Sequence, residues 1–218
     1  VCSCTVLAVD FIDYDFLGLC SEGVEWTPEH DFLVSGVGTV LRLNSSTKQM
    51  SQLVDISSAT TPATRSLGLE AVESLGLLYV AINEFSDLAS FSNTTSGLLI
   101  ANLSTGEVKS VTRFVTSSYS LANDIAVDES VPGGVAYVTD SVASKIYKVW
   151  PNGTWFAWAS DPVKLNWCNG IVIIGNWLLY GQYSTGKLFR IDIQSLTNPV
   201  IEELPLINPI SGADGIVI

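Results

Sequence analysis

The chain has 218 residues, of which 47% are hydrophobic and only 15% are charged, so it has ample material for a core and does not belong to the disordered class. Its net charge of −12 argues against nucleic acid as a partner, because nucleic-acid binding requires clustered Lys and Arg. No apolar run reaches the roughly 18 residues of a membrane-spanning helix, so no transmembrane segment is expected.

The N-terminal region contains an apolar segment, residues 5–16, that is predicted to form a strand before any repeat begins. A strand at the start of a chain can pair with the end of the fold and remove an exposed sheet edge. We expect residues 5–16 to have this closing role. Val1 fits the first residue after a removed signal peptide.

One pattern then recurs five times: a polar residue, a small or turn residue, and an alternating apolar strand. The repeat begins at Glu22, Glu70, Asn123, Asn169 and Asp214, with spacings of 48, 53, 46 and 45 residues. A period of this size, with several short strands per unit, is typical of propeller blades.

Each unit continues with the same elements in the same order. Second strands are predicted at 31–36, 77–82, 135–140 and 177–182, and third strands at 39–43, 97–102, 144–149 and 186–192. Hairpins rich in Ser, Thr, Gly and Asn lead to fourth strands, as at 105–108. No segment has sustained helical periodicity, so little helix is expected.

These units predict an all-β protein: a six-bladed β-propeller of four-stranded antiparallel blades, forming a single domain over residues 1–218. The chain covers about four blades and the N-terminal closing strand, and it stops as the fifth unit begins. At about 45 residues per blade, a six-bladed ring needs roughly 80 more residues. The rest of blade 5 and most of blade 6 are therefore expected to lie outside this sequence.

The repeated polar residues all begin innermost strands, so they are expected to converge at the top of the central channel. Turn capping explains any one of them. Five at the same structural address, including three acids and no cation, favour a metal site instead. Carboxylate and amide oxygens are the ligands that Ca²⁺ prefers.

Four N-glycosylation motifs of the form Asn-x-Ser/Thr occur, at Asn44, Asn93, Asn102 and Asn152. Asn44, Asn102 and Asn152 fall in predicted third-to-fourth-strand hairpins, and Asn93 falls in a long second-to-third-strand loop. Exposed turns can carry N-linked glycans without disturbing a core. The placement predicts a secreted, extracellular protein.

Several short motifs resemble those of a known superfamily across essentially the whole chain. Residues 21–26 (Ser-Glu-Gly-Val-Glu-Trp) resemble the Glu-Gly-Pro-x-Trp motif of the gluconolactonase and senescence-marker-protein (regucalcin) family. Residues 121–125 resemble the Asn-Asp-Ile motif of paraoxonases. Residues 168–171 and 213–216 resemble the Pro-Asn-Gly-Leu and Pro-Asp-Gly-Met motifs of the same superfamily.

The resemblance implies four ligands for Ca²⁺ or another divalent cation: Glu22, Asn123, Asn169 and Asp214. Paraoxonases also hold a structural calcium partly through the position of Asp124. Gly23 stands where paraoxonases have an acid, which puts that second ion in doubt. Glu70 has no ligand counterpart and is interpreted as a turn or channel residue.

The resemblance also implies hydrolysis of a small-molecule lactone, ester or phosphotriester, with Asp214 as general base or nucleophile. The paraoxonase-type histidine base is missing, because the only histidine, His30, lies in a turn predicted on the opposite face. A serine triad has no support either. Whether the protein is an enzyme is therefore left open.

The alternative hypothesis is a non-catalytic extracellular glycoprotein, stabilised by calcium, that binds an extracellular glycoprotein partner in adhesion or assembly. A propeller like strictosidine synthase is a less favoured third interpretation, because that branch does not depend on the full metal set.

The four cysteines, Cys2, Cys4, Cys20 and Cys168, do not have the spacing of a zinc motif, and disulfides are their expected use in an oxidising compartment. Cys20 and Cys168 each lie beside a predicted ligand and could pair across the channel mouth. Alternatively, as the resemblance to paraoxonases implies, Cys2 or Cys4 pairs with a cysteine outside this sequence and locks the closing blade.

Overall fold

The computed structural model describes residues 22–29, 31–61, 63–85, 95–115, 119–208, 210 and 212–216. These residues form sixteen strands in four antiparallel sheets, with a single short 3₁₀-helix, η1 (Glu73–Leu75). The predicted all-β propeller class is confirmed. The predicted strand at 5–16 lies outside the described residues, as do Cys2, Cys4, Cys20, His30 and Asn93.

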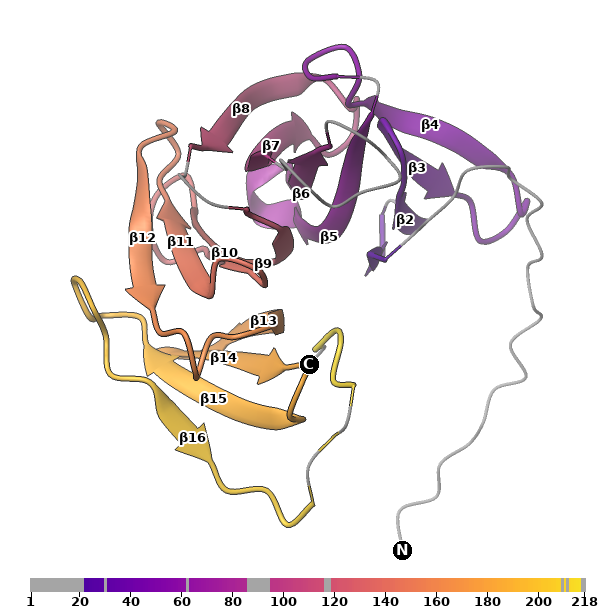
Figure 1. Ribbon diagram of the computed structural model, residues 1–218. Helices are drawn as coiled ribbons and strands as arrows, with labels where there is room; N and C mark the ends of the chain where they lie inside the picture. The colour runs from indigo at the N-terminus through magenta and orange to yellow at the C-terminus, as the bar shows by residue number, and fades with distance from the viewer. Residues whose placement is uncertain are drawn as a thin grey trace, which may run out of the picture.

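Each sheet is one blade with its strands in chain order. Blade 1 consists of β1 (Val24–Thr27), β2 (Asp31–Ser35), β3 (Thr39–Leu43) and β4 (Met50–Asp55). Blade 2 consists of β5 (Thr64–Val72), β6 (Leu77–Glu84), β7 (Thr95–Asn102) and β8 (Val108–Phe114). Blade 3 consists of β9 (Ala122–Asp128), β10 (Val135–Asp140), β11 (Lys145–Val149) and β12 (Trp155–Ser160). Blade 4 consists of β13 (Cys168–Ile174), β14 (Trp177–Gln182), β15 (Lys187–Asp192) and β16 (Glu202–Leu204). Figure 1 shows the blades arranged in an arc, with β5, β9 and β13 toward the centre and β8, β12 and β16 on the outside.

Three hydrophobic clusters fill the spaces between neighbouring blades. In β6, Leu78, Val80 and Ile82 face the cluster shared with blade 1, whereas Tyr79 and Ala81 face the cluster shared with blade 3. Successive side chains of a strand point to opposite faces of its sheet. Because both faces of β6 pack against another blade, the strand is apolar almost throughout instead of alternating with polar residues.

The hairpins after the third strands hold three of the four glycosylation motifs, as expected. Asn44, Asn102 and Asn152 each use the side-chain carbonyl to accept a backbone N–H two or three residues further on. This local hydrogen bond shapes the turn. The placement in these hairpins is confirmed, and glycosylation itself stays a prediction.

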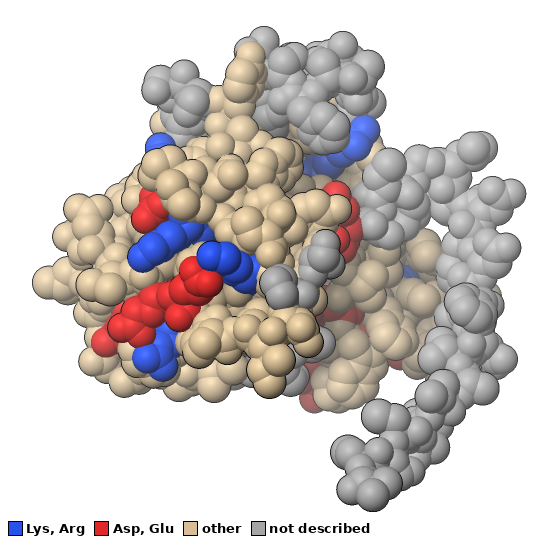
Figure 2. Space-filling model, turned by 60° about the horizontal axis from the view of Figure 1, so that its bottom comes forward, with Lys and Arg blue, Asp and Glu red and all other residues tan. Residues whose placement is uncertain are grey.

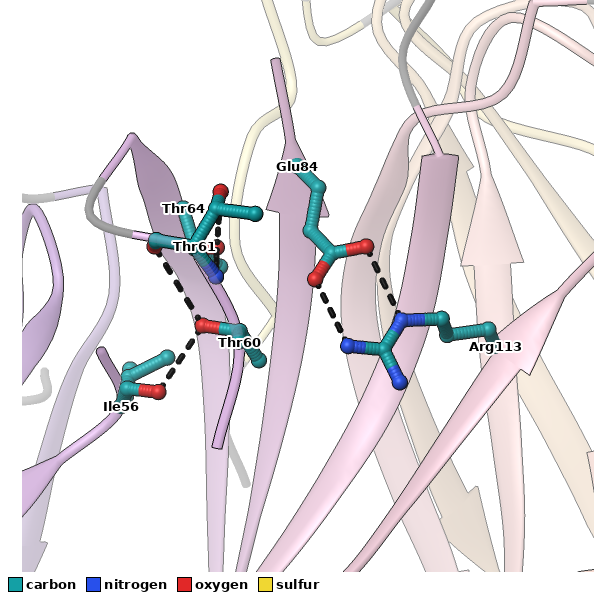
Figure 3. Close-up of polar contacts among 6 residues, drawn as sticks. All are labelled: Ile56, Thr60, Thr61, Thr64, Glu84 and Arg113. Atoms are coloured by element: carbon teal, nitrogen blue, oxygen red, sulfur yellow. Dashed lines mark hydrogen bonds and ion pairs between the residues drawn. The ribbon is translucent and has the colours of Figure 1, made fainter. Parts of the chain in front are cut away.

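Polar contacts fix the entry into blade 2 and its outer edge (Figure 3). The Thr60 hydroxyl donates to the Ile56 carbonyl at 2.8 Å, and the Thr61 N–H donates to the Thr64 hydroxyl at 3.3 Å, just where β5 begins. Further along, Arg113 of β8 donates two hydrogen bonds to the Glu84 carboxylate of β6, at 3.0 and 2.8 Å. β5 therefore starts from a defined position before it reaches the centre of the arc.

On the surface, charges of opposite sign lie close together. Figure 2, which brings the bottom of Figure 1 forward, shows acidic and basic side chains side by side on that face. The β15–β16 edge contributes the ion pairs Lys187–Glu203 at 2.9 Å and Arg190–Glu202 at 2.8 Å. Exposed pairs of this kind add at most about 1 kcal/mol each to stability. No helix in the described part of the chain is long and apolar enough to span a membrane.

The expected position of Glu70 at the start of an innermost strand is wrong. β5 begins at Thr64, so Glu70 lies near its end. A Cβ on Gly23 would lie 2.2 Å from the Leu67 carbonyl oxygen, which places Leu67 and Gly68 beside Gly23. Leu67 therefore takes the repeat position of Glu22, and Glu70 the position of Glu25. The segment Glu-Ala-Val-Glu (residues 70–73) resembles the repeat motif, but it lies three residues after the true repeat position, which is occupied by the apolar Leu67.

Candidate functional site

The four predicted ligands line one cavity of about 440 Å³ at the mouth of the channel. Glu22 lies just before β1, and Asn123 and Asn169 are the second residues of β9 and β13. Asp214 lies in the segment after β16, where the structure shows no strand among the described residues. All four also line the cavity of about 320 Å³ immediately below. Their convergence places two carboxylates and two amides around one space.

Hydrogen bonds hold the backbone at three of these positions. The buried Ser35 hydroxyl of β2 accepts the N–H groups of Glu22 at 3.2 Å and Gly23 at 2.8 Å. The Thr139 hydroxyl of β10 donates to the Asn169 carbonyl at 3.0 Å. The Gly170 N–H donates to the Asp214 carbonyl at 2.7 Å, which ties the C-terminal segment to β13.

The Asn123 side chain is oriented by a serine from the next turn of its own blade. Its Nδ2 donates to the Ser141 hydroxyl at 3.0 Å, and that hydroxyl donates to the Cys168 carbonyl at 2.6 Å. Because the amide nitrogen is engaged in this way, the Oδ1 atom remains the group available to a ligand. The role of Ser141 could not be predicted from the sequence, because no local pattern distinguishes it from the other serines.

The mouth concentrates negative charge. The pKa of Glu22 is raised by burial and by the nearby Asp214 carboxylate, and the Arg65 guanidinium opposes this shift. No three His, Cys, Asp or Glu side chains gather as metal ligands within the described part of the chain, so the candidate set depends on its two amides. Carboxylate and amide oxygens together suit a hard divalent cation such as Ca²⁺. The residues present therefore fit such an ion.

Below the mouth, Asp124 links two blades. Its Oδ2 accepts the Ile171 N–H of β13 at 3.0 Å. Burial raises its pKa to about 6; hydrogen bonds from the Ile171 and Ile125 backbones oppose the shift, and the charge of Asp214 adds to it. Gly23, which lines the same cavity as Asp124, has no side chain to contribute.

The upper wall of the cavity comes from residues two positions before the mouth residues. Arg65 of β5, Leu121 just before β9 and Trp167 just before β13 precede Leu67, Asn123 and Asn169 by two residues, and all three line the cavity. Phe85, Tyr119, Val142 and Tyr183 complete this wall. Three mouth positions have a wall residue two places earlier, whereas Gly212, two places before Asp214, does not line the cavity.

The loops that carry this wall are anchored by the buried Asp140. Its Oδ1 accepts the N–H groups of Leu121 at 2.9 Å, Val142 at 3.2 Å and Ala143 at 2.8 Å. Asp140 is inaccessible to solvent, so these bonds are needed to satisfy its carboxylate. Sequence reasoning gave Asp140 no role.

Cys168 is a free and fully buried thiol in the structure. Its expected partner Cys20 lies outside the described residues, so the pairing is not shown. Its Sγ donates to the carbonyls of Asp140 at 3.4 Å and Lys145 at 3.6 Å. Burial raises the pKa of this thiol, with a contribution from Asp140. A buried, protonated cysteine packs as a small apolar residue.

No protein-family model matches the sequence, and no curated protein matches it. Solved structures do resemble it. These include the major allergen Mala s 1 of Malassezia sympodialis, with a TM-score of 0.65 and 16% identity over 82% of this chain and 62% of the allergen. A luciferin-regenerating enzyme matches with a TM-score of 0.63 and 14% identity over 85% of this chain and 62% of its own.

A calcium-binding protein, regucalcin, from Agrobacterium tumefaciens matches with a TM-score of 0.60 and 13% identity over 86% of this chain and 61% of its own. The chain thus spans about three fifths of the length of these structures. Sequence identities this low support a shared fold but not a shared activity. These likenesses show that the chain has a β-propeller fold like that of the three structures.

Proposed function

We propose that the mouth of the channel binds Ca²⁺ or another divalent cation through Glu22, Asn123, Asn169 and Asp214, and that the site hydrolyses lactones, esters or phosphotriesters. The observation that supports this most strongly is the convergence of all four residues on one cavity. Burial, and then the Asp214 carboxylate, raise the pKa of Glu22, so a cation beside these two carboxylates would relieve their repulsion.

A bound divalent cation would act as a Lewis acid toward a carbonyl or phosphoryl oxygen. The chain's own residues supply the rest. Asp214 lies exposed at the mouth, where its carboxylate can take a proton from an attacking water and return it to the leaving alkoxide. Ser141 keeps the Asn123 amide oriented, and the Gly170 N–H fixes the backbone of Asp214.

The proposal includes secretion and N-glycosylation. Asn44, Asn102 and Asn152 lie in outer hairpins, and Asn152 is exposed. Expression in a eukaryotic secretory host followed by endoglycosidase digestion tests this part. A fall in mass that is smaller in the Asn152→Gln variant supports a glycan at Asn152. An unchanged mass of the secreted chain would count against glycosylation.

The test of catalysis is lactone and aryl-ester hydrolysis with calcium and with a chelator, paired with elemental analysis of bound metal. We expect chelation to abolish turnover and Asp214→Asn to lower kcat at least 100-fold. The matched control is Asp55→Asn, which neutralises an exposed β4 carboxylate outside the cavity and should leave turnover unchanged. Tight metal binding without turnover on any substrate would refute catalysis and favour a calcium-stabilised extracellular structural protein.

A further inference from the structure

The upper wall of the mouth cavity carries apolar side chains that metal binding and water activation do not use. Tyr119, Val142, Trp167 and Tyr183 are 54%, 43%, 48% and 49% exposed, and all four line this cavity. Large apolar side chains are costly to leave in water, and their gathering in one concave site is typical of a ligand-binding surface.

Two of these aromatic residues are held in place by the backbone. Trp167 has a φ of 55°, in the left-handed region that bulky side chains rarely adopt. Its N–H donates to the Ser141 carbonyl at 3.1 Å, and its carbonyl accepts the Tyr183 N–H at 3.0 Å. Trp167 is the one aromatic among the described non-glycine residues with positive φ. Strain of this kind persists where the surrounding structure enforces it, often at functional sites.

Arg65, in β5 of blade 2, brings a cation to the same cavity. Its guanidinium carbon lies 5.4 Å from the centroid of the Phe85 ring, a cation–π distance that holds the group in position. The Arg65 Nε is buried without a hydrogen-bond partner. The ion pairs found among the described residues do not include Arg65; they are Arg113–Glu84, Lys187–Glu203 and Arg190–Glu202. Among the described residues, no hydrogen bond or ion pair therefore engages the Arg65 guanidinium.

The charge balance of the cavity decides what such a ligand can be. Among the described lining residues, Glu22 and Asp214 are the acids and Arg65 is the cation, so their formal charges sum to −1. A divalent cation between the two carboxylates would reverse this to one net positive charge. Arg65 would then be the cationic side chain of a lining with a net positive charge.

We propose that the mouth cavity binds an organic anion with a flat apolar body, whose carboxylate or phosphate pairs with Arg65 while the body packs against Trp167 and Tyr183. A planar guanidinium can grip either group with two parallel hydrogen bonds. The inference rests on the proposed function, because the cation at Glu22 and Asp214 is what makes the cavity favourable to negative charge. It narrows the substrate class to esters or lactones that carry an acidic group and a ring.

The test uses three probes with one apolar body: 1-naphthoate, 1-naphthyl phosphate and the neutral 1-naphthamide. Their affinities for the full chain are measured by isothermal titration calorimetry, with calcium and with a chelator, at low and high salt. We expect one or both anions to bind at least tenfold more tightly than 1-naphthamide with calcium, and to weaken as salt rises. The better anion identifies the preferred headgroup.

Variants separate the two halves of the site. Arg65→Gln should remove the preference for the anions and leave 1-naphthamide unchanged. Trp167→Asn, which keeps a residue that tolerates positive φ, should weaken all three probes. The matched control is Arg190→Gln: Arg190 also lies over an aromatic ring, Trp177, at 4.1 Å, but it is outside the cavity, so probe affinities should not change.

Equal binding of the anions and the amide by the wild-type chain would overturn the inference, even if Arg65→Gln proved unable to fold. An unchanged anion preference in folded Arg65→Gln would overturn it as well. Calcium binding without anion preference refutes this inference alone and leaves the metal proposal standing. Anion preference that needs Arg65 but persists in chelator refutes the role of the metal and keeps the anion subsite.

Discussion

At the scale of single residues, the mouth depends on side chains that orient the candidate ligands. The side-chain amide of Asn123 donates a hydrogen bond to the Ser141 hydroxyl, which in turn donates to the Cys168 carbonyl of the neighbouring blade. Groups behind a metal ligand fix its orientation and usually matter almost as much as the ligand. Ser141 is such a group in this cavity.

Removal of this hydroxyl should weaken metal binding. We expect Ser141→Ala to lower calcium affinity about tenfold or more, because the Asn123 amide is then free to rotate. Calorimetric titration with calcium measures the effect. Ser66→Ala is the control: its buried hydroxyl bonds only backbone groups of Gly36 and Thr39, so stability should fall by about 1 kcal/mol with calcium affinity unchanged. Equal affinity in wild type and Ser141→Ala would contradict a positioning role.

The candidate ligands could be found from the sequence because each stands at the same place in a repeat. Asn123 precedes Asp124, and Asn169 precedes Gly170, both at the start of an apolar strand. The residues that support them could not be found. Ser141 donates to the carbonyl of Cys168 in the next blade, and Asp140 accepts from the backbone of Leu121, which lies before another strand; nothing in the local sequence marks such contacts.

At the scale of strands, the inner strands approach one another so closely that glycine is required between them. A Cβ on Gly68 would lie 2.5 Å from both the Asn123 carbonyl oxygen and the Asp124 Oδ1. Real Cβ atoms essentially never come within 3.0 Å of such atoms. β5 and β9 would therefore have to separate, and the separation would shift Asn123.

We expect Gly68→Ala to destabilise the protein by about 1–3 kcal/mol and to weaken calcium binding at the same time. Chemical denaturation and calcium titration measure the two effects. Gly181→Ala in β14 is the matched control, because its Cβ would meet its nearest neighbour at 3.5 Å, an ordinary contact. A Gly68→Ala variant with wild-type stability would show that the strands are not packed as described.

Strand positions followed well from the sequence, because middle strands have a strong apolar signal and turns are marked by Gly and Asn. β10 and β14 have the predicted bounds, and β6 is only extended by two residues. The inner strand of blade 2 was the exception. Its mouth position carries Leu67, so the polar pattern pointed to Glu70 instead.

At the scale of the whole molecule, acidic side chains from several blades line the channel below the mouth. Burial raises the pKa of Glu25 to about 7, with a contribution from Asp124. Burial, followed by the charges of Glu25, Asp124 and Glu129, raises the pKa of Glu70 to about 8. In the unfolded chain both carboxyls would ionise near their ordinary value of about 4.3.

This difference makes stability depend on pH. The folded protein binds more protons than the unfolded chain between about pH 4.5 and 8, so the free energy of unfolding is highest at the acidic end and falls as pH rises. In chelator, we expect a loss of about 2 kcal/mol between pH 5 and 8, and Glu70→Gln should remove a large part of it. Urea denaturation at each pH measures this.

The control for this experiment is Glu107→Gln, which neutralises an exposed carboxyl on the β7–β8 turn and should leave the pH profile as it is. If the free energy of unfolding of the wild type stays constant or rises toward pH 8, the acids of the channel are not buried as described.

The propeller itself was predictable from the sequence, because a period of about 45 residues repeats with the same order of strands. The walls of the mouth cavity were not. They come from loops of blades 2, 3 and 4 whose positions depend on contacts such as those of Asp140, and no local pattern encodes the cavity that they enclose.

The most direct measurement is a calorimetric titration of the full chain with calcium, alongside the Glu22→Gln/Asp214→Asn double variant. We predict one calcium site per chain at the mouth, and a dissociation constant at least 100-fold higher in the double variant because both carboxylates are lost. Glu107→Gln with Asp55→Asn, which removes the same charges outside the cavity, should bind calcium as the wild type does. Absence of calcium binding, or equal affinity in the double variant, would contradict a metal site at the mouth of the propeller.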